Sequence, residues 1–311
     1  MTPPSKYPSY PQYKPSGIPW LGNVPSGWEV QPLGTQVSEN KVYNHSLREN
    51  NVLSLSYGKI VRRDVSTNFG LLPESFDTYQ IVNSGDIVLR LTDLQNDQRS
   101  LRVGLVTERG IITSAYIGLK VYNIYPLYCY FLLHSYDLSK VFYTFGGGVR
   151  QSMRYEDLKK LSIPVPPLEE QHAIATFLDR ETAKIDALIA MKRRLLELLS
   201  EKRQALISHA VTKGLNPHAP MKDSGVEWLG NVPNGWDVVR LKDICQVNPS
   251  KRSITLSDDT LVSFLPMEKL SEDGNLTLDL VKPIAEVRQG FTYFQDMDVI
   301  VAKITPCFEK W

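Results

Sequence analysis

Basic and amide side chains gather at three places in the first half of this 311-residue chain. Arginine and lysine neutralise phosphates and release their counterions, while arginine and glutamine also form paired hydrogen bonds with guanine and adenine edges. This chemistry suits double-stranded DNA, and the alternative is a set of ordinary solvated charges interspersed with acidic residues. The three groups are Tyr57, Lys59, Arg62 and Arg63; then Arg99 and Arg102; then Arg150, Gln151 and Arg154.

Motifs that carry catalysis are missing from the sequence. It has no phosphate-binding loop ending in Lys-Ser or Lys-Thr, no GxSxG, no HExxH and no dinucleotide-binding glycine pattern. Glu39-Asn40-Lys41 has no acidic partner just upstream, as a metal-dependent nuclease would need. The five histidines are isolated from one another. We therefore expect no catalytic residue, no metal site and no cofactor.

Composition sets further bounds. Lys and Arg total 35 against 34 Asp and Glu, so the net charge of +1 neither demands nor excludes a polyanion. Cys129, Cys245 and Cys307 are too scattered for a disulfide framework or a zinc site, and we expect buried thiols in a reducing cytosol. The first residues carry no apolar signal region, and no window approaches a membrane span. These features predict a cytoplasmic protein without a membrane partner.

One phrase occurs twice. SGIPWLGNVPSGWEVQPL at 16–33 returns about 208 residues later as SGVEWLGNVPNGWDVVRL at 224–241. Such self-similarity indicates two copies of one structural unit. The chain thus reads as a globular domain, a spacer and the start of a second domain, an arrangement that suits a reader of a two-part site better than an enzyme with one pocket.

The elements that must position the basic groups are mostly strands. Segments 52–60, 79–93, 102–122 and 161–167 carry β-branched residues between Gly, Asn and Asp breakers. Residues 126–145 have a helical apolar period that ends at the glycines 146–148. The first fifteen residues, rich in Pro and Tyr, predict an extended arm that is disordered unless the domain pins it. The first domain is therefore expected to be α+β.

A long helix is expected next. The IPVPP stretch at 163–167 blocks strand pairing and helix alike, and from Leu168 to about Val211 there is neither Pro nor Gly. Such a helix would be roughly 60 Å long. Its apolar residues form a near-heptad seam that needs a partner helix; the alternative is a helix lying along its own domain. The seam residues are Ile174, Leu178, Ile185, Leu188, Leu195, Leu199 and Leu206.

Taken together, these motifs resemble the specificity subunit of type I restriction-modification systems. In that family each half opens with a phrase like Trp20-Leu21-Gly22 to Trp28, and like Trp228-Leu229-Gly230 to Trp236. A strand such as GDIVLRLTD at 85–93 follows, and the half closes with a phrase like YEDLKKLSIPVPPLEEQ at 155–171. FLDRETAKIDALI at 177–189 matches the opening of the family's spacer helix.

The resemblance implies an α+β fold of strand-rich target-recognition domains joined by a long coiled-coil spacer helix, with a two-fold internal repeat. It also implies double-stranded DNA, methyltransferase subunits and a restriction subunit as partners, with all catalysis supplied by those subunits. The expected domains are a disordered arm at 1–15, a first target-recognition domain at 16–165, the spacer helix at 166–212, a linker at 213–220 and an incomplete second domain at 221–311.

The second copy departs from the family pattern. The first copy runs about 150 residues from Ser16 to the helix, whereas the second stops after about 88 and lacks a closing strand and a second helix. Either the second domain is unstable and the complex inactive, or two chains pair through their helices as a homodimer. Three function classes stay open: a DNA-reading specificity subunit, a fragment that only docks methyltransferase subunits, and a stand-alone nuclease.

Overall fold

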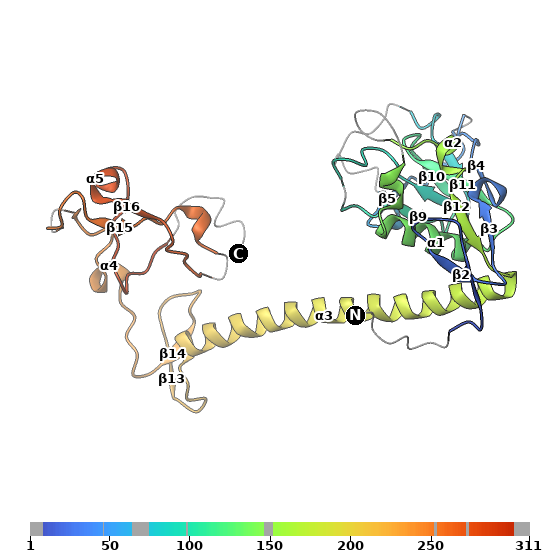
Figure 1. Cartoon of the computed structure of the whole chain (residues 1–311). Helices are drawn as coiled ribbons and strands as arrows, with labels where there is room; N and C mark the ends of the chain where they lie inside the picture. The colour runs from blue at the N-terminus through green and yellow to red at the C-terminus, as the bar shows by residue number, and fades with distance from the viewer. Residues whose placement is uncertain are drawn as a thin grey trace. The chain divides into compact units, whose positions relative to one another are not determined.

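The structure, a computed structural model, describes residues 9–45, 47–63, 75–97, 99–145, 152–251, 254–271 and 274–301. The chain divides into two compact units, Met1–Leu196 and Glu197–Trp311. The boundary falls inside one long helix (Figure 1). No helix of the described residues is long and apolar enough to cross a membrane.

The first unit is strand-rich with three α-helices, which confirms the expected α+β class. A four-stranded antiparallel sheet has the order β4-β11-β8-β9, and two-stranded pairs β1-β2, β12-β3, β5-β6 and β10-β7 surround it. The strands are β1 (Tyr13–Pro15), β2 (Asn23–Pro25), β3 (Glu29–Pro32), β4 (Val37–Glu39), β5 (Leu53–Ser56), β6 (Lys59–Arg62), β7 (Gln80–Val82), β8 (Ile87–Leu89), β9 (Val103–Leu105), β10 (Gly110–Ile112), β11 (Ile117–Val121) and β12 (Ser162–Val165). The helices are α1 (Pro126–Leu138), α2 (Tyr155–Leu158) and α3 (Leu168–Lys213), with 3-10 turns at Leu33–Thr35 and Val141–Thr144.

Strand β8 shows how the sequence builds two cores. Its three residues are all buried, and side chains alternate across a strand. Ile87 and Leu89 enter the larger core, which also contains residues of α1, α2 and β12. Val88 enters a smaller core with Leu53, Val82, Val106 and Ile112. An uninterrupted apolar strand is therefore required here, because both faces of the sheet are covered.

Helix α1 packs against β9 (Figure 1) and is shorter than its apolar period suggests. Pro126 occupies the first turn, where its missing N–H costs nothing. The helix ends at Leu138 because Lys140 adopts a left-handed conformation (φ 59°). The chain continues as the 3-10 turn Val141–Thr144, while the expected glycine stop at 146–148 lies outside the described residues.

Two expectations about proline-rich segments are corrected. Residues 162–165 do pair, antiparallel to β3, with Pro164 opposite Val30. Pro164 is tolerated because a two-stranded pair leaves each strand an outer edge where no N–H is needed. Part of the arm is also held by the domain, since the Tyr10 hydroxyl donates to Glu170 Oε1 and Tyr13–Pro15 pairs with β2.

The long helix is confirmed: α3 runs unbroken over 46 residues. Its first turns belong to the domain, because Gln171 and Ala175 are buried and Ile174 packs against the larger core. From Thr182 to His209 every residue is exposed. The central part of the helix therefore has no cover within the described chain.

The second unit contains β13 (Met221–Asp223), β14 (Asn231–Pro233), α4 (Leu241–Ile244), β15 (Leu261–Ser263), β16 (Val281–Pro283) and α5 (Ile284–Val287). Its strands form the pairs β13-β14 and β15-β16. Val232, Pro233 and Ile284 are the buried apolar residues of its described part. Folding of this unit therefore removes little apolar surface from water.

The first part of the repeated phrase takes the same local structure in both units, whereas β3 has no counterpart strand at residues 237–240. Hairpin β13-β14 repeats the register of β1-β2, with Met221 opposite Pro233 as Tyr13 is opposite Pro25. The same turn closes each hairpin, because Ser16 N–H donates to Gly22 O and Ser224 N–H donates to Gly230 O. The surroundings differ: Leu33 is fully buried, whereas its counterpart Leu241 is exposed.

Gly34 allows the closing segment to approach the opening phrase. A Cβ at this position would lie 2.9 Å from Lys159 Cβ and 3.1 Å from Lys159 O. We expect Gly34→Ala to reduce the free energy of unfolding of the first unit by about 1–3 kcal/mol, because the backbone must shift. Urea denaturation tests this. Gly27→Ala is the matched control, since a Cβ there meets nothing within 4 Å; equal stability of both variants would contradict the prediction.

Candidate nucleic-acid interface

Two described segments next to predicted basic residues contact one loop, residues 90–102, which connects β8 to β9 and carries Arg99 and Arg102. On one side lies the turn of the β5-β6 hairpin, where a Cβ on Gly58 would be 3.1 Å from Leu101 Cβ. On the other side Met153 N–H donates to Leu91 O at 2.9 Å. These two contacts join the loop to residues 43 positions upstream (Gly58 to Leu101) and 62 positions downstream (Leu91 to Met153).

Arg102 lies inside the domain, and its burial contradicts the prediction that it contacts DNA directly. Its side chain is fully buried, and the guanidinium donates to the carbonyls of Arg90 (3.1 Å) and Thr92 (2.8 Å). It also donates to the carbonyls of Asp93 and Asp97 and, through Nε, to the hydroxyl of Tyr143 at 3.0 Å. A buried arginine satisfied in this way organises the chain around it. Its basic side chain misled the sequence prediction, because burial is not visible in composition.

The loop has further fixed turns. Asp93 adopts a left-handed conformation (φ 58°), and its carboxylate accepts a hydrogen bond from Asn96 Nδ2 at 2.8 Å. The Asp97 carboxylate accepts hydrogen bonds from the hydroxyl and the backbone N–H of Ser100 and from the backbone N–H of Arg99. These donors lower the pKa of Asp97 to about 2, so its carboxylate is charged at neutral pH.

Charges on the neighbouring hairpin are already partnered. Lys59 Nζ lies 2.6 Å from Asp186 Oδ2 on α3. Arg62 Nε lies 2.8 Å from Glu108 Oε1, and this contact lowers the pKa of Glu108. Tyr57 is 86% exposed at the hairpin turn with φ 47°, an uncommon conformation for a large side chain.

The remaining predicted residues divide into three sets. Arg99 and Arg154 are exposed, and Arg63 is half-buried with its backbone N–H on Val52 O. Arg150 and Gln151 lie outside the described residues. Sequence reasoning overlooked Arg90, Gln95 and Asn96, which are exposed on the same loop. Arg90 stands inside the GDIVLRLTD phrase, so the signal that would have found it was the change from buried strand to loop at that residue.

The predicted helix seam also divides. Ile174 and Leu178 line a groove at the start of α3 together with Tyr10, Glu170, Ala173 and Phe177. These two residues are half-buried against their own unit. The other predicted seam residues are exposed on α3: Ile185, Leu188, Leu195, Leu199 and Leu206.

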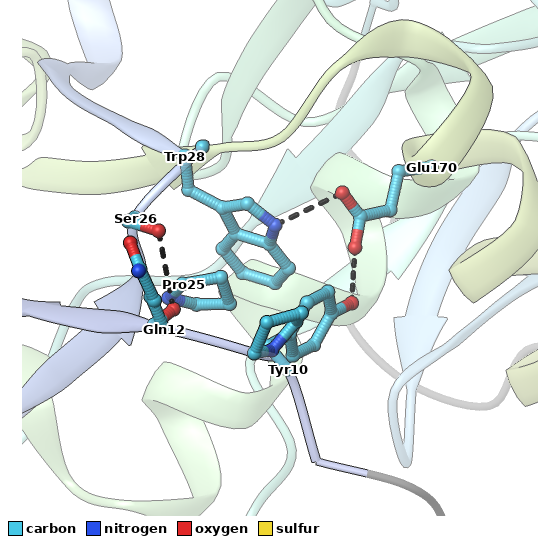
Figure 2. A pocket seen from close by; sticks show the side chains of 8 residues that line it. Tyr10, Gln12, Pro25, Ser26, Trp28 and Glu170 are labelled. Carbon is cyan, nitrogen blue, oxygen red and sulfur yellow. Dashed lines mark hydrogen bonds between the residues drawn. The ribbon is translucent and has the colours of Figure 1, made fainter.

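A small pocket of about 190 Å³ lies where the arm, the opening phrase and α3 meet (Figure 2). Trp28 Nε1 donates to Glu170 Oε2 at 3.0 Å, and the Tyr10 hydroxyl donates to Glu170 Oε1. The Tyr10 and Trp28 rings pack edge to face at 5.9 Å between centroids. Burial and Glu170 raise the pKa of Tyr10 to about 12. Since both carboxylate oxygens are engaged, the pocket functions as a structural joint between segments.

Cysteine placement corrects one expectation. Cys129 is buried in the larger core, and desolvation raises the pKa of its thiol to about 12. Cys245 is exposed, contrary to the expected buried thiol, and Cys307 lies outside the described residues. Among the described residues, no group of three or more His, Cys, Asp or Glu side chains is placed to hold a metal ion.

Comparisons with known proteins agree with the motif resemblance. Residues 102–198 match the family described as type I restriction modification DNA specificity domain. The chain is 27% identical over 239 residues to the type I restriction enzyme MjaVIII specificity subunit of Methanocaldococcus jannaschii, covering 73% of this chain and 51% of that protein. It is 33% identical over 118 residues to the EcoEI specificity subunit of Escherichia coli, covering 37% of this chain and 19% of that protein.

A solved structure is also similar. The HsdS subunit from Thermoanaerobacter tengcongensis shares 19% identity over 65% of this chain and 48% of that chain, with a TM-score of 0.39, too low to establish a shared fold. The matched family defines a DNA specificity domain of restriction-modification systems. These matches confirm the resemblance to type I specificity subunits, and the chain spans about half the length of the MjaVIII relative.

The joint makes a local prediction. Trp28→Phe removes the indole N–H that binds Glu170, so hydrogen exchange at the β1 amides should accelerate roughly tenfold, about the value of one charge-assisted hydrogen bond. Exchange measured by mass spectrometry on peptides covering residues 9–16 tests this. Trp236→Phe is the matched control from the second copy, because its indole makes no hydrogen bond within the described chain. Equal exchange in both variants would contradict the role of the joint.

Asp97 makes a pH prediction. Its folded pKa of about 2 lies below the ordinary value of about 3.9. The carboxylate therefore stabilises the turn fully above about pH 4, and this contribution disappears as the pH falls towards 2. The amide proton shift of Ser100 in NMR spectra should titrate with a midpoint near 2. Asp97→Asn should abolish that titration, whereas a midpoint near 4 would show that the contacts do not stabilise the charge.

Proposed function

We propose that this chain is the DNA-sequence specificity component of a type I restriction-modification complex, with catalysis supplied by its partner subunits. The observation that carries the proposal is that two further segments next to basic residues contact the basic loop 90–102, in a unit that overlaps the match to the DNA specificity domain. Arg90, Arg99 and Arg154 supply exposed cations there. Such side chains neutralise phosphates, while amides and arginines read base edges.

The proposed complex reads a two-part DNA site and acts in the cytoplasm. Each recognition domain would read one half of the site, and α3, paired with another helix, would fix the spacing between the two readers. Support comes from the exposed seam, because a row of apolar side chains on a long helix needs a partner surface. Methyltransferase and restriction subunits, or a second copy of the chain, are the proposed partners of this surface.

A second candidate function has its own support. The second unit has few buried apolar residues in its described part, and its described strands form two-stranded pairs that leave edges unpaired. A chain with such a unit would dock methyltransferase subunits through α3 without reading DNA. This alternative predicts complex formation without any sequence preference.

One experiment separates these functions. The chain is co-expressed with its methyltransferase subunit in a host that lacks DNA methylation, and modified bases are mapped by single-molecule sequencing. A palindromic split motif is expected from a homodimer of first units, and an asymmetric split motif is expected if the second unit also reads DNA. The absence of any motif would overturn the reading function and favour the docking fragment.

A second pair of variants in the same assay tests the proposed pairing of α3 with another helix. Leu199→Glu places a charge on the exposed seam and should abolish the motif, because a buried unpaired charge opposes helix pairing. Gln204→Glu is the matched control, since it adds the same charge to the exposed helix away from the seam. Equal motifs in both variants would show that the seam is not an interface.

A further inference from the structure

The loop between β8 and β9 differs from the other basic segments in what its side chains do. On the β5-β6 hairpin, Lys59 and Arg62 are bound to acidic partners at 2.6 Å and 2.8 Å. On the loop, the side chains of Gln95 and Arg99 are exposed and make no hydrogen bond or ion pair within the described chain. The loop therefore presents uncommitted groups, whereas the hairpin presents groups already satisfied.

The backbone beneath these groups is held from inside the domain. Arg102 is anchored on the core side, because its N–H donates to the buried carboxylate of Asp137 at 2.6 Å and its carbonyl accepts from Arg90 N–H at 2.9 Å. Its guanidinium then reaches under the loop to the carbonyls of residues 90, 92, 93 and 97. One planar fork of donors thus fixes both ends of the exposed segment.

This arrangement is costly unless a fixed loop is useful. A buried guanidinium must be desolvated, and the nearest carboxylate oxygen, on Asp97, lies 3.9 Å away. Apolar residues would fill the same space without this cost, but they could not order four carbonyls. The Tyr143 hydroxyl adds a further partner at 3.0 Å, and its ring lies 5.6 Å from the guanidinium carbon.

We propose that residues 93–97 and Arg99 form a base-reading surface and that Arg102 is its positioning residue. The inference rests on the proposed DNA-reading function and deepens it. Gln95 is the specificity residue, because an amide pairs with the two major-groove atoms of adenine; Arg99 matches the acceptors of guanine or a phosphate. Arg102 itself never touches DNA: it holds the loop in one conformation, so that base contacts form without an ordering cost.

The test measures preference and bulk affinity separately. The full chain, in complex with its methyltransferase subunit, binds two duplexes of equal length, one enriched by the wild-type complex from a random library and one shuffled. Arg102→Lys supplies a point charge in place of the fork, and Tyr143→Phe removes one acceptor while keeping the ring. Both should reduce the ratio of the two affinities about three- to tenfold. Affinity for the shuffled duplex and its salt dependence should stay unchanged, because no exposed charge is altered.

Two further variants test whether the effect is specific to the loop and to Gln95. Tyr128→Phe removes another buried hydroxyl, which donates to Pro164 O at 3.1 Å away from the loop, and should leave the ratio unchanged. Gln95→Ala should lower the ratio through one base position only, and the library enriched by that variant should lose its preference there. Circular dichroism and thermal unfolding confirm that each variant is folded.

The possible failures are distinguishable. A wild-type complex that binds both duplexes equally would overturn the proposed function and this inference with it. A wild-type preference that survives in Tyr143→Phe, Arg102→Lys and Gln95→Ala would overturn the inference alone. Faster hydrogen exchange in residues 93–100 of the Arg102 and Tyr143 variants, together with a reduced ratio, supports the positioning role.

Discussion

The antiparallel pairing of β12 with β3 is the contact on which the first unit depends. It brings Ser162–Val165 back to Glu29–Pro32 and so closes the domain over its core. Helix α3 begins three residues after β12, so the same pairing sets where the helix leaves the domain. The Trp28–Glu170 hydrogen bond then fixes the first turn of the helix to the opening phrase. Closure of the first unit and placement of α3 are therefore coupled, because β12 and α3 are almost adjacent in the chain.

The sequence allowed prediction of much of this fold, and the reasons are local. The run from Leu168 to about Val211, which lacks Pro and Gly, predicted the long helix. Segments rich in β-branched residues between Gly, Asn and Asp predicted the strands. Pro164 was misjudged because its tolerance depends on an outer strand edge, which only the tertiary pairing creates. The end of α1 was misjudged for a similar reason, since the left-handed Lys140 has no glycine to announce it.

The candidate interface was less predictable. Counting basic residues could not distinguish the buried Arg102 from the exposed Arg99, three residues away. Nor could it show that Arg62 is satisfied by Glu108, which lies 46 residues further along the chain. Burial and ion pairing depend on contacts between distant segments, whereas composition reports only the residue types. The uncharged Gln95 lies outside the three basic groups, and its residue type alone does not reveal its exposure on the loop.

Under the proposed function, ion pairing on the candidate interface would let a chain with a net charge of +1 discriminate between DNA sequences. Partnered cations such as Lys59 and Arg62 add little attraction for phosphates, so few counterions would be released on binding. Weak non-specific binding has an advantage for a reader, because the useful quantity is the ratio between cognate and other sites. A loop held by buried contacts raises that ratio without raising bulk affinity. The remaining affinity would then have to come from partner subunits, which agrees with a long helix whose apolar residues face outward for most of its length.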